Sequence, residues 1–98
     1  MLNDSSANEP ASLIPILVKK CEHALQSGLS LAEIRSSVLP EEIQKLMTEA
    51  APRSFLQWIK EDRVYSSYYY EAQQSGVCAK PGELLAAILE SIVLDALE

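Results

Sequence analysis

The chain has few of the residues on which most catalytic and metal sites depend. Its 98 residues include one histidine and two cysteines. Nucleophilic catalysis needs a serine or cysteine beside a base that a third group orients, and no such set is recognisable around His23. A helical metal site needs ligands three or four residues apart, whereas Cys21 and His23 are two apart and point to different faces. We therefore expect no enzyme activity and no metal site.

Glycine and basic residues are also scarce. None of the three glycines belongs to a glycine-rich loop after a strand, so we expect no nucleotide or other cofactor. Eight Lys and Arg stand against fourteen Asp and Glu, which gives a net charge of −6 at pH 7. This balance argues against general polyanion binding, because phosphate contacts depend on clustered cations. When the chain is divided into residues 1–51, 52–63 and 64–98, only the middle stretch is net positive, with three basic and two acidic side chains.

The sequence lacks an apolar run long enough to cross a bilayer. Glu90 and Asp95 interrupt the longest one, near the C-terminal end. No secretory signal is visible, and the wide separation of Cys21 and Cys78 does not indicate a disulfide framework. We therefore expect a cytoplasmic protein with reduced thiols and no membrane contact.

What the sequence has in abundance is apolar residues at helical spacing. Aliphatic residues, aromatic residues, methionine and cysteine together make up 48% of the chain. This share is large enough to form one compact core. No alternation typical of strands is present, so the predicted class is all-α, a bundle of five to six short helices. We expect residues 1–11 to form a disordered tail and residues 12–98 to form a single helical domain.

Capping residues and prolines predict where the helices begin and end. The first helix should end at Gly28, and Ser30 with Glu33 forms a capping box that opens a second, which should stop before Pro40. A third helix should follow up to Pro52. A fourth should run from residue 53 to about 61 and a fifth from 62 to about 74, before a last helix that follows the segment GVCAKPG.

The last helix has a broader apolar surface than one core stripe requires. Such a surface either completes a tight core or forms a contact between subunits, and the pattern favours neither. We assign the subunit contact of a homo-oligomer to four residues of this surface: Leu85, Ile88, Leu89 and Ile92.

Four tyrosines lie within six residues, at positions 65, 68, 69 and 70. Stacked nucleic-acid bases need aromatic rings beside a basic groove, and this stretch has almost no positive charge. The pattern favours core packing with one partly exposed ring.

Half of the chain resembles the small terminase subunits of tailed phages and related prophage helix-turn-helix proteins. The resemblance is carried by a helix that ends in Ser-Gly, by the capped SLAEI segment and by PRSFLQWIKEDRVYSSYYYEAQ. It implies a helix-turn-helix whose recognition helix presents Arg53, Ser54, Gln57 and Lys60 to DNA, with Arg63 nearby. Arg53 or Gln57 would contact base edges, and Ser54, Lys60 and Arg63 would contact phosphates. The chain departs from the family pattern at residues 39–51, where an additional helix separates the two expected helices.

Two functions follow from these observations. The first is a non-enzymatic DNA-recognition subunit that assembles through its last helix, so that several acidic protomers bind DNA together. The second is an acidic helical adaptor that engages a partner protein through its tyrosine and aliphatic surfaces. An adaptor does not require the exposed side of residues 53–60, and DNA binding does.

Overall fold

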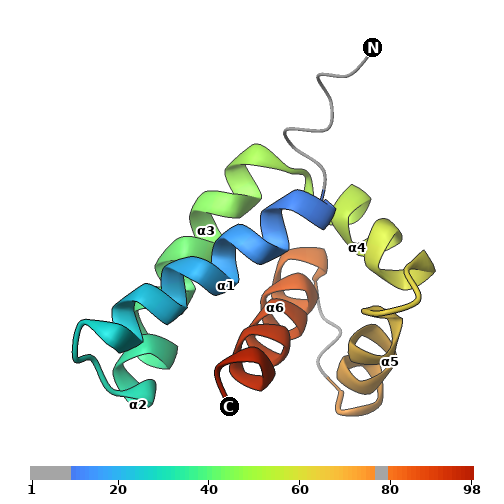
Figure 1. Ribbon diagram of the computed structural model, residues 1–98. Helices are drawn as coiled ribbons and strands as arrows, with labels where there is room; N and C mark the ends of the chain where they lie inside the picture. Colours follow the sequence, from blue (N-terminus) through green and yellow to red (C-terminus); the bar gives the residue numbers. More distant parts are fainter. Residues whose placement is uncertain (1–9, 77–79) are drawn as a thin grey trace.

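The computed structural model describes residues 10–76 and 80–98, and within these ranges the protein is an all-α bundle without strands (Figure 1). The helices are α1 (Pro10–Gln26), α2 (Leu31–Glu33), α3 (Leu39–Glu49), α4 (Pro52–Glu61), α5 (Ser66–Gln74) and α6 (Pro81–Leu97), with a π-helical segment, η2, at Ile34–Val38. No helix in the described ranges is long and apolar enough to span a membrane. The predicted all-α class is therefore confirmed.

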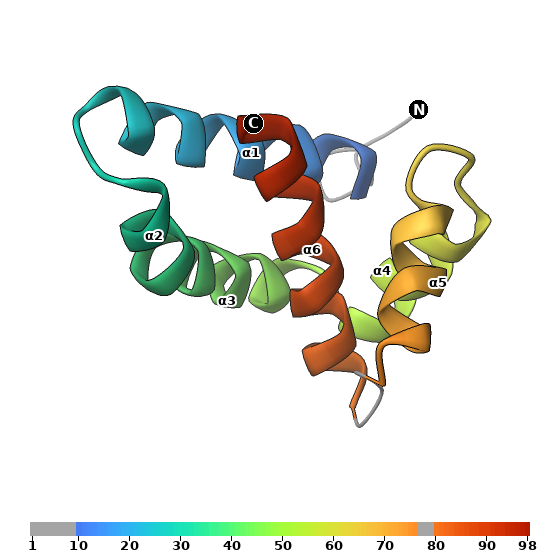
Figure 2. The same cartoon turned by 90° about the horizontal axis from the view of Figure 1, so that it is seen from below.

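Helix α6 lies at the centre of the bundle. It packs against α1 and α3 on one side and against α4 and α5 on the other, as Figures 1 and 2 show. Its buried side chains are Leu84, Leu85, Ile88, Leu89, Ile92 and Val93. Because other helices cover α6 on both sides, it needs a wider apolar surface than a helix that packs on one neighbour.

The central position of α6 corrects one sequence-based assignment. Leu85, Ile88 and Leu89 are 0% exposed, and Ile92 is 5% exposed, within a single chain. A side chain that is buried in its own core offers no surface to a second subunit. The four residues assigned to an oligomer contact are core residues.

The stretch from Leu31 to Glu49 is one continuous helical path. Ser30 and Glu33 form the predicted capping box at its start: the Glu33 N–H donates to Ser30 Oγ, and the Ser30 N–H donates to Glu33 Oε1. The predicted stop before Pro40 is wrong. The wider π-helical turn, in which the Leu39 N–H donates to the Ile34 carbonyl, directly precedes Pro40, whose nitrogen has no hydrogen to donate.

Two further boundaries differ from the prediction. Helix α1 begins at Pro10, so Pro15 lies inside the helix rather than in its first turn, and the rest of the predicted tail, residues 1–9, lies outside the described residues. By contrast, the predicted end of the first helix at Gly28 agrees with the structure. Gly28 has a φ of 110°, a left-handed conformation that glycine adopts readily at a helix end. Helix α5 begins at Ser66 rather than at residue 62, because residues 63–65, which follow Asp62, form a turn.

Candidate nucleic-acid interface

Helix α4 is anchored by one side and open on the other. Its buried side consists of Phe55, Leu56 and Ile59, which pack into the core with α6 and α5. Trp58 is half-buried, and its ring centre lies 6.0 Å from that of Tyr65. A helix fixed in this way holds its opposite side at a defined position on the molecular surface.

The open side of α4 carries the residues that the sequence assigned to DNA contact. Arg53, Ser54, Gln57 and Lys60 are all exposed, and Arg63 is exposed in the turn that follows the helix. The structure therefore brings four of the five onto one helix surface and places the fifth just beyond its C-terminal end. Two of them have partners: the Gln57 amide donates to the Glu61 carboxylate, and Lys60 Nζ lies 6.0 Å from the ring centre of Tyr69.

Among the described residues, three cations outside this region form ion pairs, whereas Lys19 and Lys80 do not. Lys20 and Lys45 lie 3.1 and 3.7 Å from the Glu42 carboxylate, and Arg35 lies 3.5 Å from that of Glu90. Within residues 10–76 and 80–98, neither Arg53, Lys60 nor Arg63 forms an ion pair. Their charge is therefore available to an external anion, since no carboxylate neutralises it at short range.

The turn between α4 and α5 is fixed by one carboxylate. Asp62 accepts hydrogen bonds from the backbone N–H groups of Val64, at 2.8 Å, and Tyr65, at 3.0 Å. Asp62 was predicted to cap the fifth helix, and its side chain caps this turn, with the helix itself beginning four residues later. The turn holds Arg63 at the end of the α4 surface.

The tyrosines mostly pack against the core. Tyr65, Tyr68 and Tyr69 are half-buried, and only Tyr70, at 49%, is exposed. This confirms the prediction of core packing with one exposed ring. The sequence did not reveal that Lys60 of α4 supplies a positive charge beside Tyr69, because the contact joins two helices.

A second contact missed from the sequence joins α5 to α6. The Tyr68 hydroxyl donates a 2.7 Å hydrogen bond to the Asp95 carboxylate, 27 residues further along the chain. This hydrogen bond favours the neutral phenol and raises the pKa of Tyr68 above its ordinary value, and desolvation acts in the same direction. No local pattern marks such a pair, since it depends on the packing of two helices.

The arrangement around α4 departs from a standard helix-turn-helix. Only Ala50 and Ala51 join α3 to α4, yet α4 packs mainly against α6 and α5 rather than along α3 (Figures 1 and 2). The additional helix that the sequence predicted at residues 39–51 is present as α3. Any contact with DNA would thus depend on α4 and the following turn, supported by the core.

The other residues that the sequence analysis considered are Cys21, His23 and Cys78. Cys21 is fully buried and its thiol pKa is raised, first by burial and then by the nearby Glu42 carboxylate, while His23 is exposed. Among the described residues, no three His, Cys, Asp or Glu side chains lie close enough to hold a metal ion. Cys78 lies outside the described residues.

No family model, curated protein or solved structure matches the chain. The resemblance to small terminase subunits consequently stays a prediction from the sequence, and the open side of α4 must be judged by its own chemistry.

Proposed function

We propose that the protein binds duplex DNA through the open side of α4 and the turn that follows it. The observation that carries the proposal is the set of three cations, Arg53, Lys60 and Arg63, which form no ion pair among the described residues. They lie within residues 52–63, where three basic side chains stand against two acidic ones, in a chain with a net charge of −6. Clustered cations of this kind contact phosphates, and a protruding helix is the element that enters the major groove.

The polar residues on the same surface suit contacts with bases and backbone. Arg53 lies in the first turn of α4, and its guanidinium can donate two hydrogen bonds to the acceptors of a guanine. Gln57 lies one turn further along the same side and can exchange its Glu61 partner for a base edge. Ser54, Lys60 and Arg63 suit phosphates, which position the helix without reading sequence.

The experiment is a fluorescence anisotropy titration of a labelled mixed-sequence duplex at low and moderate salt. We expect binding that weakens as salt rises. The double variant Arg53→Ala/Lys60→Ala should bind at least about tenfold more weakly, and the slope of log affinity against log salt should become shallower by about 1, because Lys60 supplies one phosphate contact.

The matched control is Arg35→Ala/Lys80→Ala. It removes one exposed arginine and one exposed lysine outside α4 and the turn that follows it, so both double variants carry −8 instead of −6. If the two double variants weaken DNA binding equally, the loss of affinity is due to net charge alone, and the proposal is contradicted. Absence of binding at low salt, where attraction to phosphate is strongest, would also contradict it.

A protein-binding adaptor is the second candidate, and one observation favours it. Leu25, Leu29 and Leu31 are each more than one-third exposed where α1 passes into α2. Exposed leucines that lie close together are typical of surfaces that bind other proteins. Replacing Leu29 and Leu31 with serine should leave DNA binding unchanged, whereas an adaptor would lose its protein partner.

A further inference from the structure

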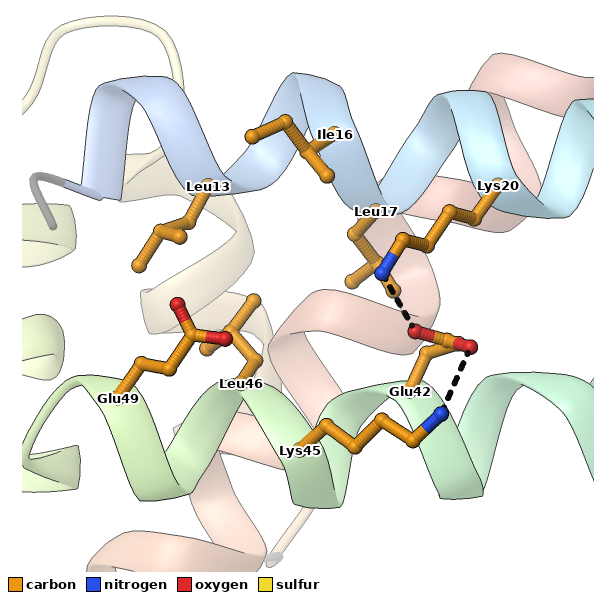
Figure 3. Close-up of a pocket in the computed structure, with 8 residues that line it drawn as sticks. All are labelled: Leu13, Ile16, Leu17, Lys20, Glu42, Lys45, Leu46 and Glu49. Carbon is orange, nitrogen blue, oxygen red and sulfur yellow. Dashed lines mark hydrogen bonds and ion pairs between the residues drawn. The ribbon is translucent and has the colours of Figure 1, made fainter. Parts of the chain in front are cut away.

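A groove between α1 and α3 forms a second candidate interface, away from the open side of α4. It has a volume of about 170 Å³ and is shown in Figure 3. Leu13 and Leu17 of α1 and Leu46 of α3 line it and are buried, whereas Ile16 at its edge is 49% exposed. An engineered apolar cavity of about 150 Å³ holds a benzene molecule, so this groove has room for one branched side chain.

The two ends of the groove carry different charged groups. At one end, Glu42 accepts a hydrogen bond from Lys20 and forms an ion pair with Lys45 at 3.7 Å. At the other end, Glu49 lies beside Leu13 and Leu46 and forms no ion pair among the described residues (Figure 3). The groove therefore combines two lysines with two glutamates and is locally neutral, in contrast to the net charge of −6 of the whole chain.

We propose that the occupant of this groove is Ile16 of a second copy of the chain, in a two-fold symmetric dimer. The complementary feature lies on α1 itself: Lys19 follows Ile16 by three residues, is exposed and forms no ion pair in the part of the chain that the structure describes. Residues three apart lie on the same side of a helix. An apolar side chain followed by a cation thus matches an apolar groove that ends in a carboxylate.

The direction of the helices supports a two-fold arrangement. Along α1, the groove runs from Leu13, at the Glu49 end, to Lys20, at the Glu42 end (Figure 3). When two copies of α1 cross in antiparallel directions, the second copy runs from its Ile16 toward the Glu49 end. Its Lys19 then reaches Glu49, and symmetry makes the same contact a second time.

Local neutrality explains why a second copy is a suitable partner despite its acidity. Two chains with a net charge of −6 repel each other over most of their surfaces. At the α1–α3 groove the charges of two lysines and two glutamates cancel, so the groove itself does not repel a second copy. Burial of Ile16 and the two Lys19–Glu49 pairs can then stabilise the dimer. This inference goes beyond DNA binding and does not depend on it.

Sedimentation equilibrium of the full chain over a range of concentrations tests the proposal. We expect the wild type to form a reversible dimer and Ile16→Glu to raise the dimer Kd by about tenfold or more, because it places a carboxylate in an apolar groove next to Glu49. Lys19→Glu should raise the Kd as well. The charge exchange Lys19→Glu/Glu49→Lys should bring it back toward the wild-type value.

Val64→Glu is the matched control. Val64 is 67% exposed on the turn after α4, so this variant adds the same charge at an exposed apolar position outside the groove and should leave the dimer Kd unchanged. Thermal melting by circular dichroism verifies that each variant is folded. A wild type that stays monomeric would overturn the proposal, and so would equal effects of Ile16→Glu and Val64→Glu. A charge exchange that dimerises more weakly than Lys19→Glu alone would also overturn it. DNA titration of the wild type and of the Ile16 and Lys19 variants reports separately on the function of α4.

Discussion

Helices α6 and α4 contain similar aliphatic residues but have opposite roles. Helix α6 is covered by other helices on both sides, and six of its side chains are buried. Helix α4 is covered on one side only, with three buried side chains, and its other side consists of polar and basic residues. In this chain the broad apolar surface belongs to the helix at the centre of the core, whereas the sharply divided helix α4 has one side exposed to solvent.

The largest effect should come from shortening a side chain of α6. Leu89 is 0% exposed, and Leu89→Ala leaves a cavity between the two halves of the bundle. We expect the free energy of unfolding to fall by about 2–5 kcal/mol, measured by urea denaturation. A loss of less than about 1 kcal/mol would mean that α6 is not the centre of the core.

A smaller effect should follow from breaking the link between α5 and α6. Tyr68→Phe removes the hydroxyl that donates to Asp95 and leaves the ring in place. We expect a loss of about 1 kcal/mol at neutral pH, since Asp95 is exposed and water replaces part of the hydrogen bond. Urea denaturation of both proteins measures the difference.

The same pair predicts a dependence on alkaline pH. The folded state raises the pKa of Tyr68, so the unfolded chain releases this proton at a lower pH than the folded chain does. The contribution of the pair is therefore complete below the ordinary tyrosine pKa of about 10 and is lost as the pH rises through the raised folded value. Tyr68→Phe should show a weaker decline of stability above that pH, and equal declines would contradict the assigned hydrogen bond.

The comparison of α6 with α4 also shows what the sequence could predict. Local signals identified the capping box at Ser30 and the end of α1 at Gly28, because each depends on residues a few positions apart. Periodicity identified α4 and its open side. The prediction of a helix end before Pro40 was wrong. A proline cannot donate the α-helical hydrogen bond, but here a π-helical turn precedes it and the backbone stays helical through Pro40.

What the sequence could not predict depends on packing between helices. The apolar surface of α6 suited a core and a subunit contact equally well, and only the positions of α1, α3, α4 and α5 around it decide the matter. The Tyr68–Asp95 hydrogen bond joins residues 27 apart. That Arg53 and Lys60 form no ion pair in the described part of the chain likewise depends on where the carboxylates of other helices lie.

The smallest effect on stability should come from the open side of α4. Arg53 and Lys60 are exposed and form no ion pair within the described residues, so Arg53→Ala/Lys60→Ala should change the free energy of unfolding by no more than about 0.5 kcal/mol. Urea denaturation of this variant beside Leu89→Ala measures the contrast directly. A large loss would mean that these cations support the fold. Near-wild-type stability together with weakened DNA binding would separate the two roles, because side chains that contribute little to the fold can be kept for contact with a ligand.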